Sequence, residues 1–136
     1  MAEAIFKHLA ARDGLQTNVE VSSAGTKDWD VGLPPDPRTR KLLSKHGYPL
    51  DPGKRARKIT QTEIDDADFL VVMSKRIAQE LNSPQNVVLL MDFTENSKGM
   101  DIPDPYPTDS FPQAFQMILE GVNALYDHLK PRIADD

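Results

Sequence analysis

The sequence predicts an α/β fold of three layers (α/β/α), in which helices cover both faces of a parallel sheet. Two continuous apolar runs, Phe69–Met73 and Val87–Met91, are typical of strands that are buried on both faces. A shorter segment, Asn18–Ser22, alternates apolar and polar residues as a half-buried strand does. Helical patterns separate the three segments, and strands separated by helices pair in parallel. We therefore expect three parallel strands within one domain that spans residues 1–136.

The first helix is predicted at the very start of the chain. Residues Met1–Arg12 place Met1, Ile5 and Leu9 on one stripe, and Gly14 follows as a plausible left-handed stop. No capping side chain and no strand precede this helix, although three strands alternate with about four helices in the remaining pattern. A four-stranded sheet whose first strand is missing would produce this order of elements.

Local signals predict the next two helices. Asp36 and Pro37 are typical of an N-cap followed by proline at the first helical position, and Gly47 closes that helix. Thr60 and Glu63 have the spacing of a capping box, which predicts a short helical turn.

Two more helices complete the pattern. Ser74 is expected to cap a helix that runs to about Leu81, where Asn-Ser-Pro stops it. The last helix is expected to end at Pro131, and its apolar residues recur every three or four positions: Phe111, Phe115, Ile118, Val122, Leu125 and Leu129.

Composition excludes several classes of function. The formal net charge of −5 argues against a nucleic-acid surface, and the absence of cysteine excludes a disulfide framework, a thiolate metal site and a thiol nucleophile. The histidines, at positions 8, 46 and 128, lack metal-ligand spacing. We expect no metal and no cofactor. The chain has no apolar run of membrane length, so we expect no membrane association and a cytoplasmic location.

A basic middle interrupts the acidic chain. We favour a solvated helix face and loop for it; the alternative is a rim that attracts an anionic substrate. Its members are Arg38, Arg40, Lys41, Lys45, Lys54, Arg55, Arg57 and Lys58.

The segment 101–109 is the strongest candidate for chemistry. It holds three prolines in nine residues, and Pro103 and Pro105 flank Asp104 directly. Proline fixes φ and biases the preceding residue toward extended backbone, so Asp104 is expected on a stiff loop. A carboxylic acid on such a loop suits the delivery of a proton to a leaving group. The alternative is an Asp-Pro turn that only leads into the last helix.

Seven stretches together resemble the low-molecular-weight protein tyrosine phosphatase family, in that family's order and spacing over nearly the whole chain. They are Met1-Ala2-Glu3-Ala4-Ile5-Phe6, Ser23-Ala24-Gly25-Thr26, Asp28-Trp29-Asp30-Val31-Gly32, Pro34-Pro35-Asp36-Pro37-Arg38, Lys45-His46-Gly47, Ala56-Arg57-Lys58-Ile59-Thr60 and Asp104-Pro105-Tyr106.

The resemblance implies a four-stranded parallel sheet and metal-free hydrolysis of phosphotyrosine through a phosphocysteine. In that family the nucleophile and an arginine lie in a Cys-x-x-x-x-x-Arg-Ser-Pro loop between the first strand and the first helix. That helix commonly begins Met-Ala-Glu-Ala, which here occupies positions 1 to 4. The resemblance therefore places the first strand, the phosphate loop, the cysteine and the arginine upstream of Met1.

The resemblance assigns roles to a few residues of this chain. Asp104 matches the general acid that protonates the departing tyrosine oxygen, and Trp29 and Tyr106 match the aromatic walls around the substrate ring. Pro107 stands where a second tyrosine is common in the family, which puts tyrosine-based regulation there in doubt.

Two further residues match groups that hydrogen-bond an asparagine inside the phosphate loop. These are Ser23 and His46, which would lack that partner in this chain. Taken without the resemblance, His46 could be an exposed residue near a helix C-terminus, and Trp29 could cover a hydrophobic edge.

The sequence therefore predicts a phosphatase by ancestry that is inactive as given, because the cysteine and the arginine loop are absent. Its substrates would be phosphotyrosine proteins or aryl phosphates. The alternative is a non-catalytic module that binds tyrosine or phosphotyrosine. A thiol-dependent arsenate reductase is disfavoured by the absence of cysteine. Loss of a central strand would leave two open edges, so we expect a partner chain, an exchanged segment or a rearranged sheet to fill the slot, and homo-oligomers through those edges.

Overall fold

The computed structural model describes residues 1–48, 50–105 and 110–135. The elements in chain order are α1 (Ala2–Arg12), α2 (Pro37–Lys45), α3 (Gln61–Asp66), β1 (Leu70–Val72), α4 (Lys75–Glu80), β2 (Val87–Leu89), the 3₁₀ helix η1 (Leu90–Phe93) and α5 (Phe111–Ala134). The α/β class is confirmed, since helices flank a short parallel sheet.

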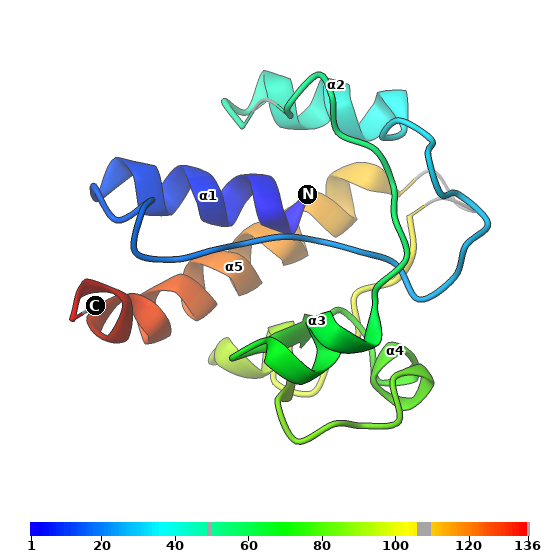
Figure 1. Ribbon diagram of the computed structural model, residues 1–136. Coiled ribbons are helices and arrows are strands. Elements are labelled where there is room, and N and C mark those ends of the chain that lie inside the picture. Colours follow the sequence, from blue (N-terminus) through cyan, green and yellow to red (C-terminus); the bar gives the residue numbers. More distant parts are fainter. Residues whose placement is uncertain (49, 106–109, 136) are drawn as a thin grey trace.

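The helices form two groups (Figure 1). Helices α1, α2 and α5 lie together in the upper part of the view, and α3 and α4 lie together below them. After α1, residues 15–25 run back beneath that helix as one long extended trace before the chain climbs to α2. The sheet lies with the lower group, because α4 packs against β1.

The packing of α1 against α5 forms the core. Ile5, Phe115 and Tyr126 are completely buried, and the rings of Phe6 and Tyr126 meet edge to face with centroids 5.3 Å apart. The Tyr126 hydroxyl donates a 2.8 Å hydrogen bond to the Asp13 carboxylate at the end of α1. These contacts fix both the position and the axial register of α1 on α5.

The predicted helix signals are confirmed at the level of their caps. The Asp36 side chain accepts from the Arg38 N–H, Thr60 and Glu63 form the capping box, and Ser74 caps α4. The first helix has no side-chain cap, as its sequence indicated. Local hydrogen bonds thus set most helix starts.

The sheet is smaller than predicted. It has two parallel strands in the described chain, with Leu70, Val71 and Val72 paired with Val87, Val88 and Leu89 respectively. The prediction of a strand at Asn18–Ser22 was wrong, since residues 19–24 form no ladder and only Gly25 makes an isolated bridge, to Lys58. A strand needs a neighbour for its N–H and C=O groups, and here no described segment lies between residues 19–24 and β1 to provide one.

Two predicted boundaries were also wrong. The apolar run Val87–Met91 leaves the strand at Leu89, because Leu90 and Met91 turn into η1 and bury both side chains completely under α5. Helix α5 continues through Pro131 to Ala134 instead of ending there. Burial of Ile133 and a 3.2 Å hydrogen bond from the Asn18 side chain to its carbonyl hold this last turn.

Within the described residues, no helix is long and apolar enough to cross a membrane.

Helix α5 lies close to η1 at Gly121. A Cβ built on this glycine would lie 2.7 Å from Leu90 Cγ and 3.1 Å from Met91 Sδ, and both of those side chains are completely buried. Gly121→Ala is therefore expected to destabilise the protein by about 1–2 kcal/mol. Overpacking costs about 1–3 kcal/mol, which exceeds the gain of about 0.5–1 kcal/mol from replacing a helical glycine. Urea unfolding at neutral pH measures the difference.

The exposed neighbour Glu120 provides the control. Glu120→Ala should change the unfolding free energy by less than about 0.5 kcal/mol. A Gly121→Ala variant as stable as the parent would show that η1 does not press on α5 as described.

Candidate functional site

The loop that carries Asp104 is anchored at the carboxyl end of β1. The Ile102 N–H donates a 2.8 Å hydrogen bond to the Met73 carbonyl, and the Asp101 carboxylate accepts a 3.0 Å bond from the Lys75 N–H at the start of α4. The Ile102 side chain is buried in the core. Ligands of open α/β sheets bind outside the carboxyl ends of the strands, and this is where the loop lies.

Asp104 lies two residues beyond this anchor, on an exposed stretch between Pro103 and Pro105. The Pro105 carbonyl accepts a 3.2 Å hydrogen bond from the Ser110 N–H at the N-cap of α5. The predicted aromatic wall Tyr106, with Pro107, lies outside the described residues.

Trp29 lies on a second tethered loop. Residues 25–33 are tied to residues 56–59 by four backbone hydrogen bonds of 2.8–2.9 Å. The Trp29 side chain is nevertheless 82% exposed, and Val31 and Leu33 on the same loop are each 52% exposed. Trp29 therefore covers no hydrophobic edge of the described structure, and its ring is available to a ligand.

Ser23 is held by the first turn of α1. Its hydroxyl donates a 2.7 Å hydrogen bond to Glu3 Oε1, which also accepts a 2.6 Å bond from Lys54 Nζ. Lys7 binds the other carboxylate oxygen at 3.0 Å. One carboxylate thus joins α1 to the loop after residue 22 and to the loop before residue 56.

The Glu3 carboxylate is strongly biased toward its charged form. Burial raises its pKa, but the hydrogen bonds from Lys54, Ser23 and Lys7 outweigh burial and lower the pKa to about 2. The side chain is only 13% exposed. Glu3 is not among the site residues predicted from the sequence, although an acidic residue in the first turn of a helix is a recognisable signal because the helix dipole favours it.

His46 lies at the C-terminal end of α2 and contacts α5. Its imidazole stacks on the Phe115 ring with centroids 4.6 Å apart. The backbone N–H of His46 donates hydrogen bonds to the carbonyls of Leu42 and Leu43. It is exposed on its other side. Within the described residues, Ser23 bonds to Glu3 and His46 stacks on Phe115, so the two predicted partners of one asparagine make different contacts here.

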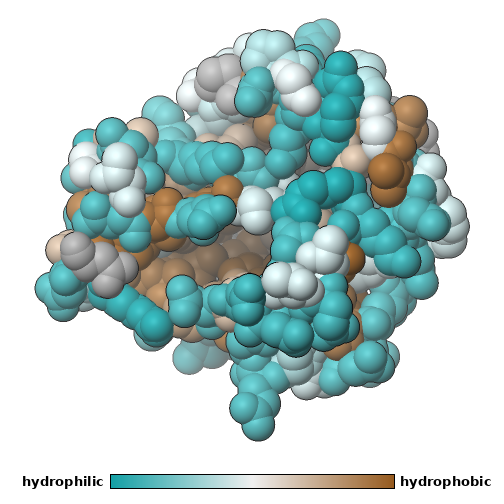
Figure 2. Space-filling view, viewed as in Figure 1, coloured by the Kyte–Doolittle hydropathy of each residue, from teal (hydrophilic) through white to brown (hydrophobic). Residues whose placement is uncertain are grey.

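A large groove connects several of these features. It encloses about 670 Å³, and Figure 2 shows a hollowed apolar area ringed by hydrophilic side chains on this face. Its walls are residues 20–26 on one side and residues 66–73 on the other. Ala2, Glu3, Ser23 and Met73 all line it, and Met73 is the residue that anchors the Asp104 loop.

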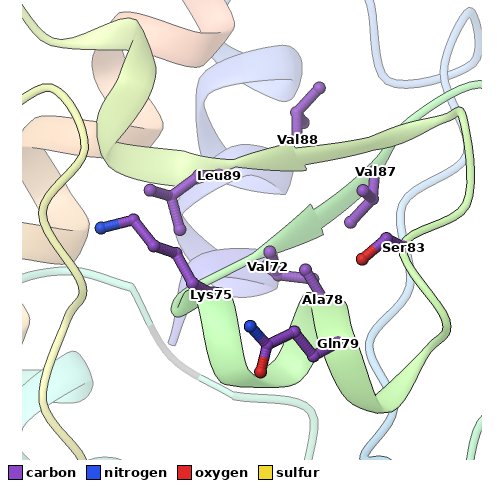
Figure 3. A pocket seen from close by; sticks show the side chains of 8 residues that line it. All are labelled: Val72, Lys75, Ala78, Gln79, Ser83, Val87, Val88 and Leu89. Carbon is purple, nitrogen blue, oxygen red and sulfur yellow. The ribbon is translucent and has the colours of Figure 1, made fainter.

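A second, smaller hollow lies beside β2 and α4 (Figure 3). It encloses about 260 Å³ and is lined mainly by aliphatic side chains, among them Val72, Val88 and Leu89. Its titratable lining residue, Lys75, donates a 2.6 Å hydrogen bond to the Gly99 carbonyl. None of the predicted site residues lines this hollow, so it is a weaker candidate for chemistry.

Three of the eight residues of the basic middle pair with carboxylates in the described residues. Lys54 binds Glu3 and Arg57 binds Glu63, each at 2.6 Å, and Arg38 binds Asp36 at 3.0 Å. These three pairs reduce the positive charge that is available to an anionic substrate, and the solvated helix face and loop remains the prediction for the other five residues. Across the described ranges, no group of three or more His, Cys, Asp or Glu residues could hold a metal ion.

Comparison with known proteins gives consistent results. The model of a family described as low molecular weight phosphotyrosine protein phosphatase matches residues 1–134. The low molecular weight protein-tyrosine-phosphatase YfkJ of Bacillus subtilis is 35% identical over 131 residues, which are 92% of this chain and 83% of YfkJ. PtpA of Staphylococcus aureus is 32% identical, with 95% of this chain and 84% of PtpA covered.

Solved structures agree with the sequence matches. The crystal structure of YfkJ superposes with a TM-score of 0.90 at 33% identity, covering 96% of this chain and 86% of that one. A Drosophila arginine phosphatase superposes with a TM-score of 0.85 at 32% identity, covering 95% of this chain and 88% of that one.

The Glu3 cluster predicts a pH-dependent contribution to stability. Because the pKa of Glu3 in the folded protein, about 2, lies below its value in the unfolded chain, its contribution is complete above about pH 4.5 and is lost as the pH falls toward 2. Glu3→Gln should lower the unfolding free energy at pH 7 by about 1.5–3 kcal/mol, the range for hydrogen bonds to a charged group. The deficit should shrink between pH 4.5 and 2 in urea titrations.

Glu95→Gln is the matched control, because Glu95 is exposed and lies outside the cluster. It should match the parent at each pH. A Glu3→Gln deficit that stays constant from pH 7 to pH 2 would contradict the assignment of the ion pairs.

Proposed function

Because the chain belongs to the low molecular weight phosphotyrosine protein phosphatase family, we propose that it carries the leaving-group side of a phosphotyrosine hydrolase. Asp104 is the general acid in this proposal, and Trp29 and Tyr106 are the walls that flank the substrate ring. Ser23 and His46 would position the phosphate-binding segment. The substrates would be phosphotyrosine proteins or aryl phosphates, and no metal or cofactor takes part.

The anchoring of the Asp104 loop carries this proposal. The Ile102–Met73 and Asp101–Lys75 hydrogen bonds hold the loop at the carboxyl end of β1. Neither bond involves Pro107, which stands where the family commonly has a second tyrosine. A general acid must reach its proton acceptor within hydrogen-bond distance, so a fixed loop is the main structural requirement for this role. The two flanking prolines restrict the backbone further.

The chemistry assigned to Asp104 follows from the reaction. Cleavage of an aryl phosphate leaves negative charge on the phenol oxygen, and a carboxylic acid placed there donates the proton that neutralises it. The resulting carboxylate can then accept a proton from the water that attacks phosphorus. The Trp29 indole adds stacking to an aryl group and so favours tyrosine over aliphatic esters.

The 136 residues contain no cysteine, so they cannot form the phosphocysteine that the resemblance implies. Phosphoryl transfer in this scheme also needs a cradle of N–H donors at a helix N-terminus and an arginine beside the thiolate. We infer that these 136 residues alone do not hydrolyse phosphotyrosine.

One observation favours a second candidate function. Trp29 is 82% exposed on a loop that backbone hydrogen bonds fix in place, which suits a stacking platform that works without catalysis. A non-catalytic module that binds phosphotyrosine would use the same ring. A relative named arginine phosphatase makes phosphoarginine a useful comparison ligand.

Turnover is expected to be absent. The purified 136-residue polypeptide, incubated with p-nitrophenyl phosphate at pH 5.5, should release p-nitrophenol at the rate of a buffer blank, because no thiolate is available to attack phosphorus. Asp104→Ala is the matched control and should give the same baseline. Multiple turnovers by the parent that are lost in Asp104→Ala would refute the inference and reveal another nucleophile.

Binding without turnover is tested through Trp29. If the protein is a non-catalytic module that binds phosphotyrosine, a labelled phosphotyrosine peptide should bind more tightly than the matched phosphoserine and phosphoarginine peptides. Fluorescence anisotropy measures the three affinities. Trp29→Ala should lower the affinity for the phosphotyrosine peptide by about tenfold, because stacking and apolar contact are lost. Leu33→Ala, a truncation on the same exposed loop, should leave it unchanged. Equal affinity for all three peptides, or no effect of Trp29→Ala, would exclude this function.

A further inference from the structure

We propose that Glu80, the last residue of α4, is a positioning residue that holds the Trp29 loop (residues 25–33) in place relative to the loop that carries Asp104. The consequence for a ligand rests on the proposed function, in which the Trp29 ring flanks the aryl group of phosphotyrosine. Glu80 touches no ligand in this proposal and acts through Thr26.

The charges of α4 are placed against its own dipole. Lys75 and Arg76 occupy its first turn, and Glu80 occupies its last turn. The positive end of a helix dipole lies at the N-terminus, so cations there and an anion at the C-terminus destabilise the helix. The stability of α4 by itself therefore does not explain why these residues stand where they do, and their contacts with other parts of the chain do explain it.

Glu80 binds the start of the Trp29 loop. Its Oε2 accepts a 2.5 Å hydrogen bond from the Thr26 hydroxyl, and its Oε1 lies 4.0 Å from Lys27 Nζ. The hydrogen bond from Thr26 lowers the pKa of Glu80 more than partial burial raises it, so the acceptor is charged at neutral pH. Hydrogen bonds to a charged acceptor are stronger than those between neutral groups. Trp29 follows Lys27 by two residues, so this contact lies close to the ring that it positions.

The contact with Glu80 gives the Trp29 loop a second point of attachment. Four backbone hydrogen bonds tie the two ends of the loop to residues 56–59, and Arg57 joins those residues to Glu63 on α3. Attachment along this stem alone would allow the loop to turn about it. A second attachment on a different helix, α4, fixes the direction in which the loop points.

Helix α4 also anchors the loop that carries Asp104. At its first residue, the Lys75 N–H donates to the Asp101 carboxylate, and Lys75 Nζ donates a 2.6 Å hydrogen bond to the Gly99 carbonyl. At 1.5 Å per residue, the six residues of α4 span about 9 Å. The proton donor and the aromatic wall are thus held at opposite ends of one short helix. A fixed distance between two such groups is what orientation of a bound aryl phosphate requires.

The first test needs no ligand, because Trp29 is the single tryptophan of the chain. Time-resolved anisotropy of its emission measures nanosecond motion of the loop. Thr26→Val, which removes the donor and leaves α4 untouched, and Glu80→Ala should each raise the amplitude of the nanosecond component at least about twofold.

Two control variants isolate the contact between the loop and the helix. Thr26→Ser keeps the hydroxyl and should leave the motion of Trp29 unchanged. Arg76→Ala removes an exposed cation that lies 3.9 Å from Glu80 but keeps the hydrogen bond from Thr26, and it should also leave the motion unchanged.

The second test measures peptide affinity. Glu80→Ala should lower the affinity for a labelled phosphotyrosine peptide by about threefold, because the loosened loop must be ordered on binding. It should leave the affinity for the matched phosphoserine peptide unchanged. In a Trp29→Ala background Glu80→Ala should have no further effect, because both residues act through the same ring. A general loss of stability would instead affect both peptides and would persist in that background.

The outcomes separate this proposal from the proposed function. Unchanged motion of Trp29 in both Thr26→Val and Glu80→Ala overturns the positioning role, whatever the peptides do. An equally large effect of Arg76→Ala also overturns it, since the charge balance of α4 would then be the cause. So does a parent preference for phosphotyrosine that Glu80→Ala leaves intact, or an additive effect with Trp29→Ala. If the variants loosen Trp29 but the parent shows no preference for phosphotyrosine, the proposed role of the ring fails and Glu80 still positions the loop.

Discussion

The packing of α1 on α5 is the contact on which the rest of the structure depends. The sheet cannot play this part, because it consists of two strands of three residues each in the described chain. Tyr126 joins the two helices twice, through its edge-to-face contact with Phe6 and its hydrogen bond to Asp13. Burial and the neighbouring carboxylate raise the pKa of this phenol to about 12, so the hydroxyl remains a donor to Asp13 throughout the neutral range.

Fixing α1 and α5 fixes the two ends of the candidate site. The first turn of α1 presents Glu3, whose carboxylate holds Ser23 and Lys54 and so positions the two loops beside it. At the start of α5, the Ser110 N–H donates a hydrogen bond to the carbonyl of Pro105, the residue after Asp104. The acid-bearing loop and the Trp29 loop are thus both tied to the scaffold through backbone contacts, which preserve their positions even though no thiol nucleophile is present in the sequence.

The groove lies along an edge of β1 that pairs with no strand of the described chain. Residues 19–24 have the alternating pattern of a strand and run in an extended course, yet they form no ladder. The apolar side chains of β1 and α5 that would cover a strand there line an open hollow instead. The chain covers 83% of the length of YfkJ.

Local chemistry let the sequence alone determine the α/β class and the starts of most helices. Caps such as Asp36 and Thr60 bond to residues two or three positions away, and the apolar stripe of α5 follows from its own periodicity. The resemblance also marked Asp104 and Trp29, whose loops the structure then places. Only the tertiary structure decided that Asn18–Ser22 stays outside the sheet, that Leu90 and Met91 turn under α5, and that α5 passes Pro131. Each of these outcomes depends on a neighbour distant in sequence: a partner strand, the surface of α5 around Gly121, or the Asn18 side chain. The role of Glu3 was also decided by the tertiary structure. Its carboxylate accepts hydrogen bonds from Lys7 on its own helix and from Ser23 and Lys54 farther along the chain, and these three donors meet only when the chain is folded.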